Sequence, residues 1–237
     1  MFSLTRRGLA AASGLTMAIA SLAACSPSSS SHGLAVVATT TQICDYVTQI
    51  AARSTDISLD KTDASGQSAH VGAAPEGAAL TMSLTCLLAP NASAHEHEMT
   101  PAQTKALSEA DVMAVSGVDL EHFLDDAVAS SGFKGRMVVT SGVLTAADID
   151  NPGTPDPEVA YTIDRGGERV NVAPWPFPPE EAGEEPEFRF DPHVWTSPKG
   201  AHVQVANLGA GLAAAAPDAA SSINAATASY LEDIDAL

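Results

Sequence analysis

Residues 34–41, LAVVATTT, decide the fold because an unbroken apolar run is followed at once by three threonines. A short apolar run without polar alternation is typical of a strand buried on both faces, as in a parallel sheet. Threonine is a favourable N-cap residue, and Ile43, Tyr46, Val47 and Ile50 follow at helical spacing. The stretch therefore predicts a buried strand that leads directly into a helix.

The alternation of strand and helix continues along the chain. Strand-like apolar runs occupy residues 80–88, 111–117 and 137–140, and helical spacing occupies residues 100–107 and 120–128. Such alternation indicates crossover connections and a mostly parallel sheet. The predicted fold class is α/β, with one lobe over residues 34–216 that contains a four-stranded parallel sheet flanked by helices.

Two segments depart from this pattern. Residues 54–77 are rich in Ser, Ala, Gly and Asp and predict an irregular loop. Residues 147–190 hold eight prolines among many carboxylates, which predicts a mobile surface excursion without a core, with at most a small hairpin at 161–172. Helical spacing returns after residue 198, and a second, alanine-rich helix is expected over residues 217–237.

Composition and charge limit the classes of ligand. The chain has 237 residues, of which 45% are hydrophobic, so it can bury a large core. It carries 29 Asp plus Glu against 11 Lys plus Arg, a formal net charge of -18. Such a charge repels phosphate backbones and attracts cations. We therefore expect no nucleic-acid partner.

The N-terminus indicates export. Residues 1–24 combine a basic start with an apolar run at 8–20 that is too short to span a bilayer permanently, which is typical of a signal peptide. Residues 22–25, LAAC, resemble a bacterial lipobox, in which Cys25 is acylated after cleavage. Residues 26–33 then form a Ser-rich tether. We expect an extracytoplasmic chain with a lipid anchor in the cell membrane, an ordinary cleaved signal being the alternative.

Cys44 and Cys86 form an even pair in an oxidising compartment, which makes a disulfide possible. They become neighbours if the strands at 34–38 and 80–88 pair in parallel, and a disulfide then needs Cα atoms within about 7 Å. The alternative is two buried free thiols. No Cys-x-x-Cys spacing supports a thiolate metal site or a redox motif.

Two histidines are candidate metal ligands. His95 follows the second strand, and His193 lies in an Asp-Pro-His turn ahead of a helix. In open parallel sheets the loops beyond the carboxyl ends of the strands converge on one crevice. Two imidazoles brought together there suit zinc or manganese. By itself, however, the alternating stretch at 94–98, AHEHE, also fits a solvated loop.

A combination of segments is more specific than any one of them. These segments are residues 36–41, 87–101, 110–111, 117–121, 191–195 and 198–199. Together they resemble the zinc/manganese-type solute-binding lipoproteins of bacterial ABC importers (cluster A-I), in the same order over residues 34–237. The resemblance implies that His95 and His193 bind metal. It also implies a receptor, not an enzyme, that captures a divalent ion, zinc first and manganese second, and delivers it to an ABC permease.

The resemblance is incomplete in two respects. Members of that family have two lobes joined by a long helix, and the second lobe supplies the other two ligands. Here the chain reaches Leu237 within residues 217–237, the expected start of that linking helix, so the resemblance implies a missing second lobe. Residues 147–190 lie where zinc-type members carry a His-rich loop, but they contain no histidine, which favours manganese mildly or a solvated linker.

The remaining histidines are predicted not to bind metal. They are His32 and His70 in low-complexity stretches, His97 as a solvent-facing loop residue, His122 on the outer side of a helix, and His202 inside the helix that follows the Trp turn. Two other functions stay open. One is a truncated surface lipoprotein or vestigial fragment with an adhesive role or no transport role. The less favoured is a metal-dependent hydrolase using Glu96 or Glu98 as base, which lacks a His-Glu-x-x-His helix.

Overall fold

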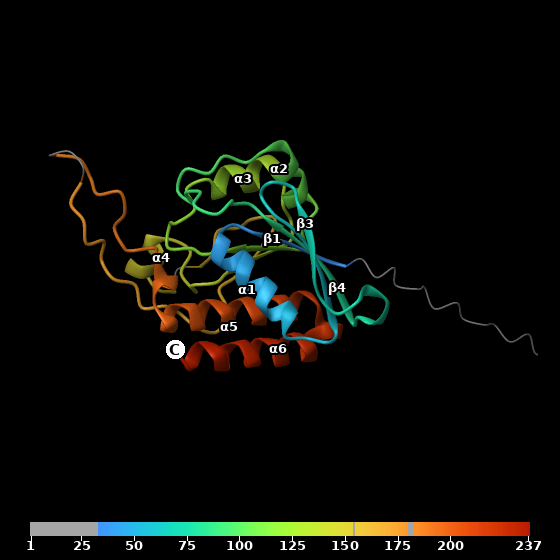
Figure 1. Ribbon diagram of the computed structural model, residues 1–237. Coiled ribbons are helices and arrows are strands. Elements are labelled where there is room, and N and C mark those ends of the chain that lie inside the picture. Colours follow the sequence, from blue (N-terminus) through green and yellow to red (C-terminus); the bar gives the residue numbers. More distant parts are fainter. Residues whose placement is uncertain (1–32, 154, 180–182) are drawn as a thin grey trace, which may run out of the picture. The chain divides into compact units, whose positions relative to one another are not determined.

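The computed structural model describes residues 33–153, 155–179 and 183–237 (Figure 1). The predicted signal peptide, Cys25 and most of the Ser-rich tether lie outside these residues. Within the described residues, no helix has both the length and the apolar character needed to cross a bilayer.

The core elements alternate as the sequence predicts. In chain order they are β1 (Leu34–Ala38), α1 (Thr41–Ala52), β2 (Ile57–Thr62), β3 (Ser68–Gly72), β4 (Leu80–Cys86), α2 (Pro101–Ser108), β5 (Val112–Val115), α3 (Leu124–Ser131) and β6 (Arg136–Val139). They are followed by α4 (Ala146–Asp150), β7 (Thr162–Asp164), α5 (Pro198–Ala215) and α6 (Ala220–Asp235), with 3-10 turns at Pro75–Gly77, Val194–Thr196 and Pro217–Ala219.

The strands form one sheet in the order β3-β2-β4-β1-β5-β6-β7. Every neighbouring pair is parallel except β2 and β3, which form an antiparallel edge. The predicted α/β fold class is confirmed. The expectation of four strands is wrong, because the sheet of the described residues has seven.

The additional strands come from the two segments in which irregular structure is predicted. β2 and β3 lie within residues 54–77, where β2 buries Ile57 and Leu59 while β3 is an edge strand whose residues are exposed except for the partly buried Val71. β7 pairs in parallel with β6, so the small hairpin at 161–172 is not formed. The same excursion buries Val170 and Phe188, which contradicts the expectation that it contributes no core. Because most of the excursion is polar, its hydrophobic periodicity does not indicate that these residues are buried.

Helices cover both faces of the sheet (Figure 1). The apolar positions of α1 pack on one face together with α5 and α6, as Ile43, Leu208 and Ile223 illustrate. The opposite face carries a second cluster that includes Leu107 at α2 and Ala127 of α3. Thr40 caps α1 by accepting a hydrogen bond of 3.2 Å from the Ile43 N–H, which is the cap that the threonine run predicts.

Two long-range contacts secure this architecture. Cys44 at the start of α1 and Cys86 at the end of β4 are joined by a disulfide, with Cα atoms 5.6 Å apart.

The expected last helix is α6, which buries Ile223 and Ile234 against the rest of the lobe. Its role as the start of an inter-lobe helix, and the domain boundaries as a whole, stay predictions.

Candidate metal site

His95 lies in the loop that follows β4 and is held by the backbone of another loop. Its Nδ1 is 3.0 Å from the carbonyl oxygen of Leu120. Because a carbonyl oxygen only accepts hydrogen bonds, Nδ1 carries the proton of the neutral ring. The lone pair is therefore on Nε2, the nitrogen that a metal ion needs.

His193 is held in the same tautomer by a different partner. Its Nδ1 is 2.8 Å from Oδ1 of Asp191, and its backbone N–H donates to the same oxygen at 3.0 Å. A carboxylate beside Nδ1 fixes the orientation and the tautomer of the ring, as in carboxylate–histidine–metal arrangements. The lone pair of His193 is thus also on Nε2.

The structure brings these two predicted ligands together. The ring centroids of His95 and His193 lie 5.6 Å apart, with an interplanar angle of 81°. With zinc–nitrogen bonds of about 2.0 Å and tetrahedral angles, two coordinated imidazoles have centroids roughly 5 Å apart. The pair is therefore close to the spacing that one ion requires. Among the residues that the structure describes, no group of three or more His, Cys, Asp or Glu is placed to hold a metal.

Aromatic side chains from the Pro-rich excursion and from the turn after His193 lie beside the pair. Phe188 is 4% exposed, and its ring centroid is 4.8 Å from that of His95. Trp175 lies 5.0 Å from Phe188 and 5.9 Å from His193, while Trp195 lies 5.3 Å from His193. Sequence reasoning missed Phe188 and Trp175, because they lie in a segment whose composition indicates a coreless loop.

Two strand-like stretches of the excursion pair with each other and carry these groups to the site. The N–H of Trp175 donates to the carbonyl of Arg189 at 3.0 Å, and the N–H of Asp191 donates to the carbonyl of Ala173 at 2.8 Å. This antiparallel contact places Phe188 and Asp191 next to the histidines. Aromatic residues recurring in an otherwise polar segment are the signal that could have indicated it.

The loop that presents the Leu120 carbonyl has an unusual backbone. Val118 and Asp119 have φ values of 59° and 55°, in the left-handed region that non-glycine residues rarely occupy. The conformation is held by the Val118 N–H, which donates to the Val143 carbonyl at 2.9 Å, and by the Asp119 N–H, which donates to the Leu144 carbonyl at 3.1 Å. Local backbone strain of this kind persists where the surroundings fix it.

Glu121 holds the same loop from inside the protein. It is 5% exposed, and its carboxylate accepts from the N–H groups of Ser116 at 2.7 Å and Gly117 at 3.1 Å. The Thr39 hydroxyl donates to it at 2.6 Å. Burial raises the pKa of Glu121, and the hydrogen bonds from Thr39, Ser116 and Gly117 oppose that rise. Glu121 thereby fixes the turn that leads to Leu120.

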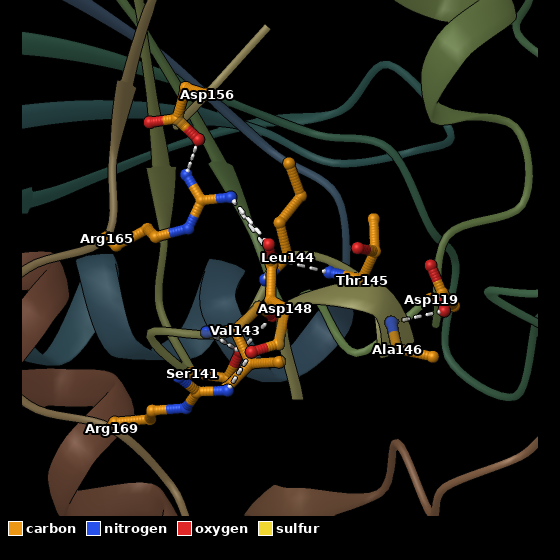
Figure 2. A network of polar contacts seen from close by, with 10 residues as sticks. All are labelled: Asp119, Ser141, Val143, Leu144, Thr145, Ala146, Asp148, Asp156, Arg165 and Arg169. Atoms are coloured by element: carbon orange, nitrogen blue, oxygen red, sulfur yellow. Dashed lines mark hydrogen bonds and ion pairs between the residues drawn. The ribbon is translucent and has the colours of Figure 1, made fainter. Parts of the chain in front are cut away.

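A second carboxylate, Asp148 of α4, links the start of that helix to Arg165 in the segment after β7 (Figure 2). It accepts from the N–H groups of Leu144 at 2.9 Å and Thr145 at 3.0 Å, and it pairs with Arg165 at 3.1 Å. Burial alone raises the pKa of Asp148, but the bonds from Thr145, Arg165 and Leu144 outweigh it and lower the pKa below its ordinary value. Arg169 adds a bond of 2.7 Å to the Asp148 carbonyl.

His97 and His122 differ from expectation. His97 is half-buried against Phe123, with ring centroids 5.0 Å apart, and burial lowers its pKa, so it is not a solvent-facing loop residue. His122 is exposed but lies in the loop before α3, not on a helix, and its ring centroid is 5.8 Å from that of His95.

The other described histidines lie elsewhere. His70 is on β3 and pairs with Asp60 at 3.0 Å, so its stretch is an ordered edge strand. His202 is on α5 and lies 2.7 Å from Asp235 of α6. His32 lies outside the described residues. Neither His70 nor His202 contacts the His95–His193 pair.

Comparisons with known proteins agree with the observed fold. A family described as "Zinc-uptake complex component A periplasmic" matches residues 77–237. The zinc-bound AdcA of Streptococcus pneumoniae is similar in structure, with a TM-score of 0.52 and 16% identity over 86% of this chain and 31% of that chain. The metal-dependent lipoprotein YcdH of Bacillus subtilis gives a TM-score of 0.51 and 17% identity, over 85% of this chain and 52% of that chain. The chain thus spans about a third of the length of the first relative and about half of the length of the second, and the likeness shows the fold.

Proposed function

The chain belongs to the family of periplasmic zinc-uptake components, and on this premise we propose that it captures a divalent metal ion outside the cytoplasm for delivery to an ABC importer. Zinc is the first candidate and manganese the second. The observation that carries the proposal is the pair His95 and His193, whose ring centroids lie 5.6 Å apart and whose Nδ1 atoms are both engaged by hydrogen bonds, which leaves both Nε2 atoms for a metal ion.

The donor set favours zinc. Imidazole nitrogen suits zinc, whereas manganese prefers sites with more carboxylate and water oxygens. The family consists of solute-binding proteins rather than enzymes, so we assign the pair to binding and not to hydrolysis. The net charge of -18 raises the local concentration of cations around the protein and so assists capture. The similarity to the zinc-bound AdcA adds support.

Isothermal titration of the purified chain with zinc chloride and with manganese chloride tests the proposal. We expect one zinc ion to bind per chain, and the double variant His95→Ala, His193→Ala to lose that binding. His70→Ala is the matched control, because it removes an imidazole that does not contact the pair. Equal, weak binding by all three proteins would mean that the metal ion binds only to carboxylates. That result would favour a surface lipoprotein without a transport role.

The proposed location is the outer face of the cell membrane, with Cys25 as the lipid anchor. Mass spectrometry of the protein extracted from membranes tests this part separately. We expect a mature chain that begins at Cys25 and carries lipid, and we expect Cys25→Ser to release the protein from the membrane fraction. Unlipidated protein with cleavage at another residue would contradict the anchor but leave metal capture intact.

A further inference from the structure

Asn207 of α5 is a buried polar side chain that makes three hydrogen bonds to backbone groups. It is 1% exposed. Its amide nitrogen donates to the carbonyl of Thr140 at 2.9 Å and to the carbonyl of Glu168 at 2.9 Å. Its amide oxygen accepts from the Glu168 N–H at 3.0 Å. One side chain of α5 thus joins the residue that follows β6 to the Pro-rich excursion.

The bonds to Glu168 resemble the pairing of two backbone segments. Because the Asn207 amide binds both the N–H and the carbonyl of one residue, it fixes the position and the direction of the chain there. The contact is close. A Cβ atom added at Gly166 would lie 2.1 Å from Oδ1 of Asn207, and one added at Gly142 would lie 2.2 Å from the Glu168 carbonyl oxygen. Glycine at these two positions therefore allows the excursion to approach α5 and the sheet.

The segment held by Asn207 leads to the aromatic side chains beside the candidate metal site. Val170 is 6% exposed and anchors the segment in a small apolar cluster. Trp175 follows, and its N–H donates to the carbonyl of Arg189 at 3.0 Å. This pairing places the ring of Phe188 with its centroid 4.8 Å from that of His95.

We propose that Asn207 is a positioning residue for metal binding, which acts through Phe188 on His95. The inference rests on the proposed function and adds a residue outside the His95–His193 pair. Phe188 packs against the His95 ring and so limits the orientations that the ring can take before an ion binds. A side chain that is ordered in advance lowers the cost of binding. Loss of the Asn207 hydrogen bonds should therefore leave His95 less restricted and weaken the affinity for zinc.

Zinc titration calorimetry of the full chain tests the effect on affinity. We expect Asn207→Ala to raise the zinc dissociation constant by about 2- to 10-fold, the range that corresponds to ordering one side chain. The control is Leu212→Ala on the same helix, in a core cluster whose described members include no residue of the excursion. An equal loss of affinity in Leu212→Ala would overturn the inference, because general destabilisation would then explain both results.

A double-mutant cycle tests whether Asn207 acts through Phe188. Phe188→Ala removes the ring beside His95, so adding Asn207→Ala to it should change the dissociation constant by less than about 2-fold. A merely structural role would instead add its full effect in both backgrounds. The same fold-change with and without Phe188 would overturn the inference.

Two adjacent glycines provide a test that leaves the Asn207 amide in place. Gly166→Ala puts a Cβ atom where the Asn207 oxygen lies, and the φ of 66° at Gly166 adds strain. Gly167→Ala is the matched control, because an added Cβ atom there meets nothing within 4 Å. We expect Gly166→Ala, but not Gly167→Ala, to raise the zinc dissociation constant. Equal constants for these two variants would contradict the proposed role of Asn207.

Tryptophan fluorescence reports on the excursion without metal. The chain has two tryptophans, so Trp195→Phe leaves Trp175 as the only one. Trp175 is partly buried, and Asn207→Ala in this background should shift its emission to longer wavelengths while circular dichroism still shows a folded chain. Unchanged emission and unchanged zinc affinity would overturn this inference and leave the proposed function standing. Failure of the wild type to bind zinc would overturn both.

Discussion

The two histidines of the site are held in the same tautomer by regions of opposite character. The partner of His95 is a carbonyl 25 residues away, in a loop fixed by the buried carboxylate of Glu121. The partner of His193 is Asp191, two residues away, with about a third of its side chain exposed. The orientation of His95 therefore depends on the whole fold, whereas that of His193 depends on a local turn. A substitution that disturbs the loop held by Glu121 should therefore lower the free energy of unfolding. A substitution of Asp191 should instead weaken metal binding.

The largest expected effect follows from Glu121→Ala. The change leaves the buried N–H groups of Ser116 and Gly117 without acceptors, so we expect a loss of about 3 kcal/mol in the free energy of unfolding. Urea unfolding followed by circular dichroism measures it. Glu232→Ala, at an exposed glutamate of α6, is the control. A loss below about 0.5 kcal/mol, the range of surface changes, would remove the contrast between the two regions.

Asp191→Ala should affect binding instead of stability. Without the carboxylate the His193 ring loses its fixed tautomer, so we expect zinc affinity to fall by about 10–100-fold. The free energy of unfolding should change by no more than about 0.5 kcal/mol. Asp191→Asn keeps an oxygen acceptor and should lose less affinity than Asp191→Ala. A large loss of stability in Asp191→Ala would show that this turn also supports the fold.

Asp148→Asn should have an intermediate effect on stability that depends on pH. Because the folded state lowers the pKa of Asp148 below its ordinary 3.8, the carboxylate stabilises the fold above that pH and stops doing so as pH falls through the folded pKa. We expect the variant to be about 1 kcal/mol less stable at pH 7, after allowance for solvent screening of the Arg165 pair. Urea unfolding at pH 7 and near pH 3 should show this gap shrinking. A gap that is equal at both pH values would contradict the assignment.

The smallest effect is expected at the exposed pair of Arg189 and Asp150, whose oxygen and nitrogen lie 2.6 Å apart. Solvent and salt screen such a pair, so Asp150→Asn should not shift the urea midpoint measurably. Unfolding at low and at high salt provides the check. A clear, salt-dependent loss would show that surface ion pairs contribute to holding the excursion beside His193.

The core strands and their helices could be predicted because each is defined by neighbouring residues. The run at 34–41 predicts β1 and a threonine N-cap for the helix that follows, and both are present, the cap being Thr40. β2 and β3 could not be predicted in the same way. β2 mixes apolar and polar residues in ISLDKT, and β3 is an exposed edge whose side chains need not be apolar. Their structure depends on pairing with a strand found elsewhere in the chain.

The two histidines of the candidate site were predictable from their positions after strands and from the family resemblance. The groups that orient and surround the two histidines were not predictable. Leu120 contributes a backbone carbonyl, which no residue type reveals, and Phe188 contributes a ring from a segment whose composition indicates disorder. The apolar spacing that begins at Leu120 predicts that His122 lies on a helix, whereas α3 starts only at Leu124.

The sequence by itself determined the alternation of strands and helices, the N-caps, the acidic character and the two candidate ligands. These properties depend on residue type and on spacings of a few residues. Only the tertiary structure decided that the loop at 116–121, the excursion at 147–190 and the loop after β4 meet at His95. The contact between these three segments depends on the order of the strands and on backbone hydrogen bonds between residues far apart in the chain. The spacing of residues within one segment does not reveal either.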